Sequence, residues 1–230
     1  ATGDGIELGQ EAGAALDDIE FVQIHPTTDP ESGYMFTEGL RGDGAILLNS
    51  QGMRFTDELL TRDVVSANIL KQEGGIAYLV TNEEMKEENA ALAGYIKKGY
   101  ATECATLADV AKAIGAEEAA VVESMAKYKD AVAAGTDAEF GREHLTKDLS
   151  EGPYYILKVT PGIHHTMGGL KIDTTTHVIS TEGSAIKGLY AAGEVTGGVH
   201  GANRIGGNAV TDIIVFGRIA GKTAAEELGK

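Results

Sequence analysis

A glycine-rich stretch near the C-terminal end constrains this chain more than any other feature. The apolar residues 188–192 predict a buried strand, which leads directly to Glu194. Glycines recur as far as Gly206-Gly207, and residues 208–228 then show the pattern of a helix. A strand-end acid can bind ribose or ribityl hydroxyls, and a helix N-terminus offers free N–H groups to an anionic group. The stretch therefore favours a nucleotide or flavin site, although a glycine-rich loop without a ligand stays an alternative.

The charge balance excludes several kinds of partner. With 19 Lys and Arg against 35 Asp and Glu, the formal net charge is −16. Such acidity argues against binding to nucleic acid or to an anionic membrane surface. No apolar run approaches the roughly 20 residues of a membrane-spanning helix, so we expect no membrane insertion. Cys104 is the single cysteine, which rules out an internal disulfide and a cysteine metal cluster.

The chain has three zones that differ in amino-acid composition and in predicted secondary structure. Residues 1–65 combine glycines with short apolar runs: residues 21–24 predict a strand that ends at His25-Pro26, and residues 45–48 predict one arm of a hairpin. The last zone, from residue 153 on, returns to strands and glycines, with further strands predicted over 154–159, 169–172 and 188–192.

The middle zone, roughly residues 66–150, is rich in Ala, Glu and Lys and has a helical period. Asn82 and Thr106 are good N-caps, and Gly115 is expected to end the second of these helices. A longer amphipathic helix is expected before Gly135, with its apolar face at Val121, Val122, Met125, Tyr128 and Val132. No catalytic constellation is evident in this zone. The layout suggests one domain interrupted by an inserted one.

Three further clusters contain residue types that occur in catalytic, substrate-binding or metal sites. His25 follows a strand, Glu38 and Arg41 are three residues apart, and His164-His165 lie between glycines. Taken alone, the first cluster fits a hydrogen-bonded surface histidine and the second fits a surface ion pair of little energetic value. A zinc site at the paired histidines is disfavoured, because adjacent side chains point apart and no cysteine joins them. We therefore expect no metal.

These clusters, in this order, resemble the flavoprotein subunit of the fumarate reductase and succinate dehydrogenase superfamily, and most of all the soluble flavocytochrome c-type fumarate reductases. The resemblance covers nearly the whole chain, and its matching runs are residues 2–5, 21–27, 37–42, 61–63, 164–169 and 188–212. It implies an α/β (α+β) fold in which part of a Rossmann-like FAD-binding domain, residues 1–28 and 153–230, is interrupted by an α+β capping domain, residues 29–152.

One departure from the family bears on the cofactor. No Gly-x-Gly-x-x-Gly fingerprint for the FAD pyrophosphate follows a strand in the first zone. We therefore expect the chain to be the C-terminal portion of such a protein, with FAD held partially or lost in the chain alone. The expected partners are the missing N-terminal FAD-binding part and an electron-donor domain or protein, since haem-binding Cys-x-x-Cys-His motifs are absent.

The resemblance also implies roles for single residues in the reduction of fumarate to succinate. Hydride would pass from flavin N5, and Arg62 would donate the proton, supplied through Glu38 and Arg41. His25 and Thr37 would bind one substrate carboxylate, and His164 and Arg204 the other, Arg204 through its bidentate fork. The implied FAD-binding residues are Thr2, Asp4, His165, Glu194, Gly206, Gly207, Asn208, Ala209 and Val210.

Other functions stay open at this point. Relatives in the superfamily reduce urocanate or other acrylate-type substrates, while His25 and Arg204 favour fumarate here. A succinate dehydrogenase-like subunit is a further alternative, since these residues do not reveal the direction of the reaction. An alternative of another class is a non-catalytic fragment that lacks the half of the domain that binds the FAD pyrophosphate.

Overall fold

The computed structural model describes residues 2–229 and divides into two compact units. Unit 1 comprises Ala1–Gln23 and Ile163–Lys230, and unit 2 comprises Ile24–Gly162. The chain passes from one unit to the other within strand β2 (Val22–Thr28) and again within strand β6 (Tyr154–Thr166). The mixed α/β fold class is confirmed. The assignment of the two units to an FAD-binding part and a cap stays a prediction.

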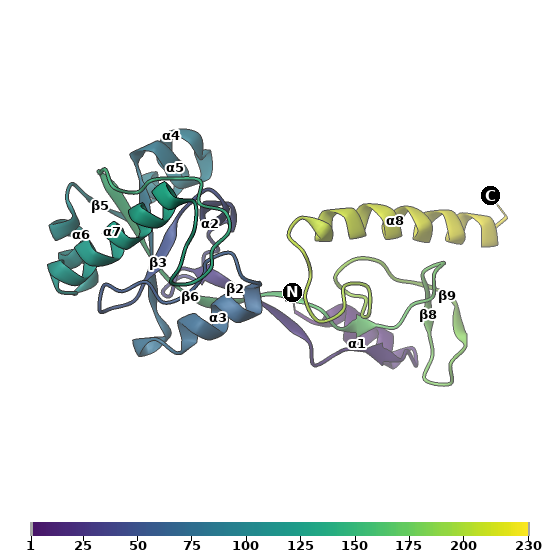
Figure 1. The fold of residues 1–230 in the computed structure, drawn as a ribbon. Helices are drawn as coiled ribbons and strands as arrows, with labels where there is room; N and C mark the ends of the chain where they lie inside the picture. The colour runs from purple at the N-terminus through teal and green to yellow at the C-terminus, as the bar shows by residue number, and fades with distance from the viewer. Residues whose placement is uncertain (1, 230) are drawn as a thin grey trace. The chain divides into compact units, whose positions relative to one another are not determined.

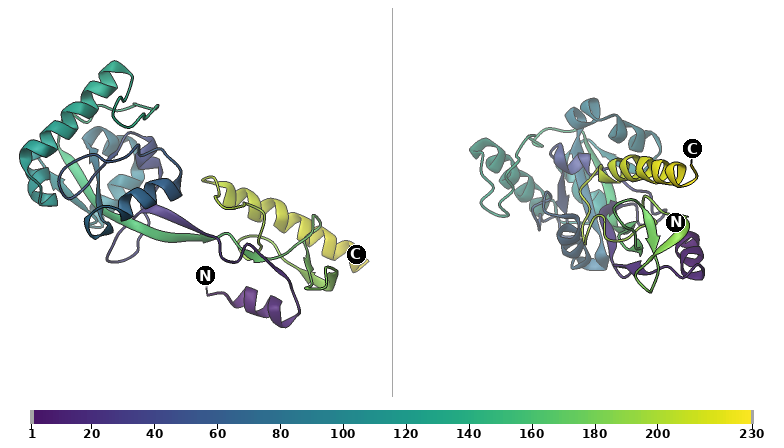
Figure 2. Two further views of the ribbon diagram at one scale, coloured as in Figure 1. Left: turned by 60° about the horizontal axis from the view of Figure 1, so that its bottom comes forward. Right: turned by 90° about the vertical axis from the view of Figure 1, so that its right-hand side faces the viewer.

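Unit 1 combines two helices with two small antiparallel sheets. The sheets pair β1 with β7 and β8 with β9, and α8 lies beside the β8–β9 hairpin (Figures 1 and 2). Its elements are α1 (Asp4–Glu11), β1 (Leu16–Asp17), β7 (Gly169–Leu170), β8 (His177–Ile179), β9 (Ala185–Tyr190) and α8 (Asn208–Glu227). The predicted C-terminal helix is confirmed, and it begins after Gly207, whose φ is 81°.

Two adjacent glycines in unit 1 allow backbone segments to approach closely. A Cβ atom on Gly168 would lie 2.0 Å from the carbonyl oxygen of Asp18, and one on Gly169 would lie 2.1 Å from that of Val195. Leu170 N–H donates to the same Val195 oxygen at 2.8 Å. Any side chain at these glycines would therefore collide with backbone rather than with a movable side chain.

Unit 2 is built on a five-stranded sheet of order β2-β6-β4-β3, with β5 also paired to β6. In the antiparallel pairs, Ala77 lies opposite Val159 and Ile46 lies opposite Val80. Its other elements are α2 (Gly39–Gly42), β3 (Ile46–Leu48), α3 (Arg62–Leu70), the 3₁₀ turn η1 (Glu73–Gly75), β4 (Ala77–Asn82), α4 (Glu83–Glu88), α5 (Ala90–Lys97), β5 (Ala101–Cys104), α6 (Leu107–Ile114) and α7 (Glu118–Ala134).

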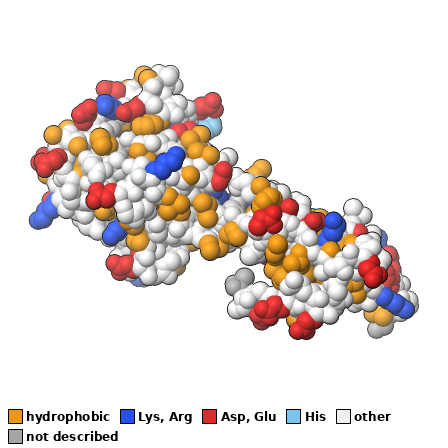
Figure 3. Space-filling model, turned by 90° about the horizontal axis from the view of Figure 1, so that it is seen from below, with side chains coloured by type: hydrophobic (Ala, Val, Ile, Leu, Met, Phe, Trp, Pro, Cys, Tyr) orange, Lys and Arg blue, Asp and Glu red, His pale blue; other side chains and the backbone are white. Residues whose placement is uncertain are grey.

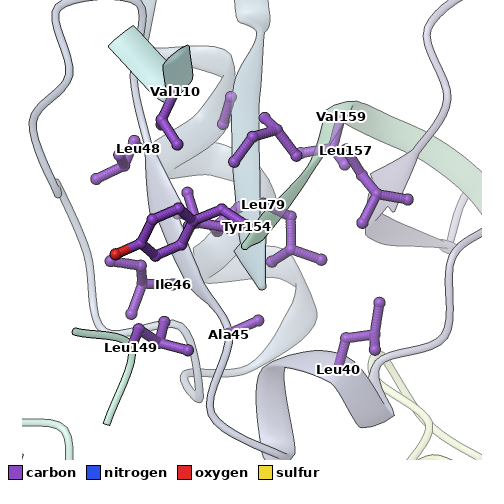
Figure 4. Close-up of a cluster of buried hydrophobic side chains, with 14 of the residues drawn as sticks. Leu40, Ala45, Ile46, Leu48, Leu79, Val110, Leu149, Tyr154, Leu157 and Val159 are labelled. Atoms are coloured by element: carbon purple, nitrogen blue, oxygen red, sulfur yellow. The ribbon is translucent and has the colours of Figure 1, made fainter. Parts of the chain in front are cut away.

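Unit 2 contains the main hydrophobic core of the described residues. Side chains of the central strands meet those of the helices that cover them, as Figure 4 shows for Ile46, Leu79, Val110 and Leu157. Leu40 of the single-turn helix α2 is fully buried in the same cluster and anchors that turn to the sheet. The second cluster, in unit 1, has four buried members: Ala14, Leu170, Val178 and Ala191.

The predicted helix ends of the middle zone are confirmed. The Asn82 side chain accepts a hydrogen bond from Met85 N, and Thr106 forms a capping box with Asp109. Gly115 and Gly135 end α6 and α7 with φ values of 80° and 66°.

Several predictions about the strands need correction. The strand expected to end at His25-Pro26 continues to Thr28; β2 is the last strand in the sheet order, so the missing N–H of Pro26 costs little. Strands β4 and β5 interrupt the zone that was expected to be helical. On α7, Val122 is 42 % exposed rather than part of the buried face.

The surface agrees with the acidic composition. Figure 3 shows acidic side chains spread over the face drawn, with hydrophobic ones among them. Among residues 2–229, no helix is long and apolar enough to cross a membrane. The same residues contain no cluster of three or more His, Cys, Asp or Glu side chains that could hold a metal ion.

Candidate active site

His25 is fully buried on β2, and hydrogen bonds fix the orientation of its ring. Its Nε2 lies 2.7 Å from the carbonyl oxygen of Phe36 and 2.9 Å from the Thr27 hydroxyl oxygen. A carbonyl oxygen can only accept, so Nε2 carries a proton. The other nitrogen, Nδ1, lies 3.7 Å from a Glu38 carboxylate oxygen. Nδ1 can thus donate to an anion only when the ring is an imidazolium.

Glu38 and Arg62 meet although 24 residues separate them. Arg62 begins α3, and its Nη2 donates to Glu38 Oε1 at 2.5 Å. Burial raises the pKa of Glu38, but the charge and hydrogen bond of Arg62 and the charges of His25 and Arg41 outweigh this effect and hold the pKa below its usual value. Glu38 is therefore ionised at neutral pH and forms an ion pair with Arg62.

Arg41 lies on α2 and is 5 % exposed. Its Nη1 donates to the carbonyl oxygen of Glu58 at 2.6 Å, and its Nε makes no hydrogen bond to any described residue. Burial lowers the pKa of Arg41 to about 10, and the nearby charge of Glu38 acts in the opposite direction. Such a guanidinium releases a proton more readily than one in water.

Thr37 stands at the entrance to α2 and is partly exposed. Its hydroxyl oxygen accepts a hydrogen bond from Gly39 N at 3.2 Å, and its own N–H donates to the Tyr95 hydroxyl at 3.0 Å. The hydroxyl hydrogen of Thr37 can therefore be offered to an anion. Unit 2 thus brings together His25, predicted to bind a substrate carboxylate, and Glu38, Arg41 and Arg62, predicted to deliver the proton.

In unit 1, His164 and His165 lie on β6 and not on a loop, and His165 is buried. Burial lowers the pKa of His165, as do the charge of nearby Arg204 and the neighbouring His200, while Glu194 acts in the opposite direction. Arg204 is 6 % exposed, and its carbonyl oxygen accepts from Gln23 Nε2 at 2.7 Å. Whether His164 and Arg204 bind the same carboxylate stays a prediction.

His165 has a further histidine, His200, beside it, and this contact was not predicted from the sequence. The His165 and His200 rings meet edge to face with centroids 5.7 Å apart, and His200 Nε2 lies 3.0 Å from Asp212 Oδ2. His165 Nδ1 is buried without a hydrogen bond to any described residue. A polar ligand at this position would satisfy that nitrogen.

A pocket of about 490 Å³ opens beside the start of α1. Three of the residues predicted to bind FAD line it: Thr2, Asp4 and Glu194. Glu194 accepts from Thr166 N at 2.9 Å; burial raises its pKa, but this hydrogen bond and the charge of His165 lower it below the usual value. The other predicted residues do not line this pocket: Gly206 and Gly207 directly precede α8, and Asn208, Ala209 and Val210 form its first turn, where no side chain caps the helix.

A buried group of four charged side chains next to Arg41 was not predicted from the sequence. Arg54 forms ion pairs with Glu58 and Asp137, and Arg142 forms one with Glu58. Glu58 and Arg142 are 84 residues apart, so no local spacing connects them. The only sequence pattern that pointed to this group is the mixture of charged and apolar residues in segments 53–59 and 137–145. Such a mixture is too common to identify a site.

Comparison with known proteins places these residues in a family context. Residues 1–210 match the family model described as FAD binding domain. The chain is 47 % identical over 226 residues to a protein of Shewanella frigidimarina named fumarate reductase (cytochrome), covering 98 % of this chain and 40 % of that protein. It is 42 % identical over 231 residues to the NADH:acrylate oxidoreductase of Vibrio harveyi, covering 97 % and 23 % respectively.

A solved structure shares the fold. The open conformation of a flavocytochrome c3 fumarate reductase superposes with a TM-score of 0.79 at 44 % identity, over 98 % of this chain and 40 % of that one. The chain thus spans about 40 % of the length of the Shewanella protein and less of the Vibrio protein.

Proposed function

The chain belongs to the FAD binding domain family, and from that premise we propose that it is part of an FAD-dependent reductase that converts fumarate to succinate. The observation that carries the proposal is the cluster of His25, Glu38, Arg41 and Arg62 in unit 2, in which every side chain except that of Glu38 is buried. An acid, two guanidinium groups and an imidazole next to each other suit the delivery of a proton to a dicarboxylate. Similarity to the Shewanella fumarate reductase supports the substrate.

The side chains of unit 1 fit FAD. The pocket beside α1 offers Thr2, Asp4 and Glu194 to hydroxyl groups, and the buried His165 Nδ1 needs a polar partner. The uncapped start of α8, from Asn208 on, suits the edge of a ring system that gains negative charge. When bound, FAD supplies the hydride for the reduction.

The substrate carboxylates are assigned to two pairs of residues. His25 and Thr37 bind one: the Thr37 hydroxyl donates, and His25 donates through Nδ1 once it is protonated. His164 and Arg204 bind the other, and the Arg204 guanidinium provides the planar donors that a carboxylate prefers. These pairs hold the double bond still while a proton and a hydride reach its two carbons.

Arg62 donates the proton to one alkene carbon, and its charge stabilises the negative charge that develops there. It recovers a proton through Glu38, with which it shares a hydrogen bond of 2.5 Å. Arg41, whose pKa burial lowers to about 10, returns a proton to this path and regains one from solvent. Each turnover thus consumes one proton from water, and no residue stays changed.

A substrate panel tests the proposal. The flavin-loaded enzyme that contains this chain is assayed with reduced methyl viologen against fumarate, acrylate and urocanate, and in reverse with succinate. Fumarate should give the highest kcat/KM. Faster reduction of acrylate or urocanate would support the alternative substrates, and no turnover by a protein with bound flavin would support the non-catalytic alternative. Flavin absorbance of this chain alone shows whether it retains FAD.

The assignment of His164 predicts a pH dependence of substrate affinity. Because fumarate stays a dianion above about pH 5 while free histidine titrates near ~6.5, protonation of a binding histidine strengthens the interaction. We expect fumarate affinity to increase as pH falls from 8 to 6. The increase should be smaller in His164→Ala, where His25 is the only histidine left among the proposed carboxylate-binding residues. Equal pH slopes in the two proteins would exclude His164 from the carboxylate pair.

A further inference from the structure

The four charged side chains beside Arg41 form a balanced and almost completely buried network. The side chains of Arg54, Glu58, Asp137 and Arg142 are between 0 and 4 % exposed. Two guanidinium groups face two carboxylates, so the charges cancel. Arg54 donates to both carboxylate oxygens of Glu58 at 2.8 Å and lies 2.8 Å from an Asp137 oxygen. We call this group the buried network.

Arg142 is the member of the buried network that contacts the proposed proton path, through the backbone of Arg41. Its Nη2 donates to the carbonyl oxygen of Arg41 at 2.8 Å, and its Nη1 donates to the carbonyl oxygen of Ala45 at 3.0 Å and to Glu58 at 2.9 Å. Its Nε donates to His144 O at 3.0 Å. A single rigid guanidinium thus fixes the two ends of the turn that follows α2.

Glu58 holds the side chain of the same arginine. Its carbonyl oxygen accepts from Arg41 Nη1 at 2.6 Å, while its carboxylate accepts from Arg54, Arg142 and Leu47 N. The backbone of Arg41 is therefore fixed by Arg142, and its guanidinium is fixed by Glu58.

Helix α2 is too short to be stable by itself, and the buried network supports it. A single helical turn of four residues is not stable by itself, because nucleation fixes several dihedral angles for very few hydrogen bonds. Leu40 anchors one face of this turn in the core, but an apolar contact alone does not fix the direction of the neighbouring side chain. Buried ion pairs often add no stability over an apolar core, so geometric precision is the better explanation for this one.

We propose that Arg142 is a positioning residue for proton delivery: together with Glu58 it holds Arg41 in the orientation that serves Glu38 and Arg62. This inference rests on the proposed function and extends it to residues that lie outside the substrate and cofactor sites. Arg142 reaches the reaction only through Arg41, whereas Arg54 stabilises the same network without any hydrogen bond to Arg41 among the described residues.

A matched pair of variants tests the proposal in the flavin-loaded enzyme. Arg142→Lys removes the hydrogen-bonding fork at Arg41, and Arg54→Lys removes an equally buried fork that holds Glu58 and Asp137. With both proteins folded to the same extent by circular dichroism, we expect Arg142→Lys to lower kcat at least tenfold and Arg54→Lys less than threefold. KM for fumarate should stay within threefold in both variants. The position of Arg41 affects proton transfer in the transition state and not the binding of fumarate in the ground state.

A double-variant cycle separates positioning from general weakening of the fold. In the Arg41→Ala background, Arg142→Lys should have no further effect on kcat, since the residue through which it acts is already gone. The solvent deuterium isotope effect on kcat should increase in Arg142→Lys alone. Equal losses of kcat in the Lys variants of Arg54 and Arg142, or a full additional loss in the Arg41→Ala background, would overturn the proposal.

Two results keep the inference separate from the proposed function. If the wild-type enzyme reduces no fumarate, the proposed function fails; if it does and Arg142→Lys is unaffected, this inference fails. Should Arg142→Lys not fold, Tyr128→Phe replaces it: it keeps the ring that lies 5.6 Å from the Arg142 guanidinium and removes only the hydrogen bond of 3.1 Å from the Tyr128 hydroxyl to Gly44 O, in the turn that Arg142 holds. It should lower kcat about threefold with KM unchanged, and an unchanged kcat would overturn the proposal.

Discussion

Replacing Arg62 with Ala should lower kcat for fumarate reduction at least 100-fold, roughly the contribution of a general acid, while KM changes by less than about tenfold. The variant loses the group that donates the proton and the 2.5 Å hydrogen bond with Glu38, but none of the four proposed carboxylate-binding residues. Turnover with reduced methyl viologen, normalised to bound flavin, measures the effect.

A second cation, at the C-terminal end of the same helix, provides the control. Lys71, directly after the last residue of α3, is exposed and bonds to Asn68, so Lys71→Ala should leave kcat within twofold. More than about 1 % of wild-type turnover in Arg62→Ala would show that another group donates the proton. A loss of flavin in that variant would show a structural role instead.

Gly168→Ala should unfold unit 1. The new Cβ atom would lie 2.0 Å from the carbonyl oxygen of Asp18 and 2.4 Å from Ile19 Cα, and neither backbone atom can move without displacing β1. We expect the free energy of unfolding to fall by more than about 3 kcal/mol, beyond ordinary overpacking, with loss of bound FAD. Thermal unfolding followed by circular dichroism and flavin absorbance measures both effects.

Gly221 offers the matched control in the same unit. It lies within α8, and a Cβ atom there would meet nothing within 4 Å. Gly221→Ala should therefore stabilise the chain by about 0.5–1 kcal/mol through a better helix propensity. If the two alanine variants unfold at the same temperature, the close backbone approach at Gly168 does not limit the stability of unit 1.

Local patterns predicted the capped and glycine-terminated ends of the middle-zone helices, whereas α1 and α3 were not predicted. The caps at Asn82 and Thr106 and the glycine stops after α6 and α7 are decided by residues within one turn of each other, so the sequence shows them directly. Strands β4 and β5 were missed, because their pairing with β6 depends on residues at least 50 positions away. The extension of β2 through Pro26 depends likewise on its place at the edge of the sheet.

The candidate site was predictable from its resemblance to a family, but hardly from spacing alone. Glu38 and Arg62 are 24 residues apart, and by spacing Glu38 and Arg41 resembled an ordinary surface ion pair. The buried network was not predictable by either route. Its partners meet across 84 residues, and an isolated arginine such as Arg142 gives no local sign that it will be enclosed.

The two ends of unit 2 leave on neighbouring strands. The Thr28 hydroxyl of β2 donates to Thr160 O of β6 at 2.7 Å, and a Cβ atom on Gly162 would touch the Thr28 side chain. A segment whose ends lie together can enter a host chain at one break without forcing that host apart. Unit 2 could therefore have been acquired, exchanged or refined as a module during evolution. Chimaeras that swap residues 24–162 between relatives of different substrate preference can exploit the same property in the laboratory.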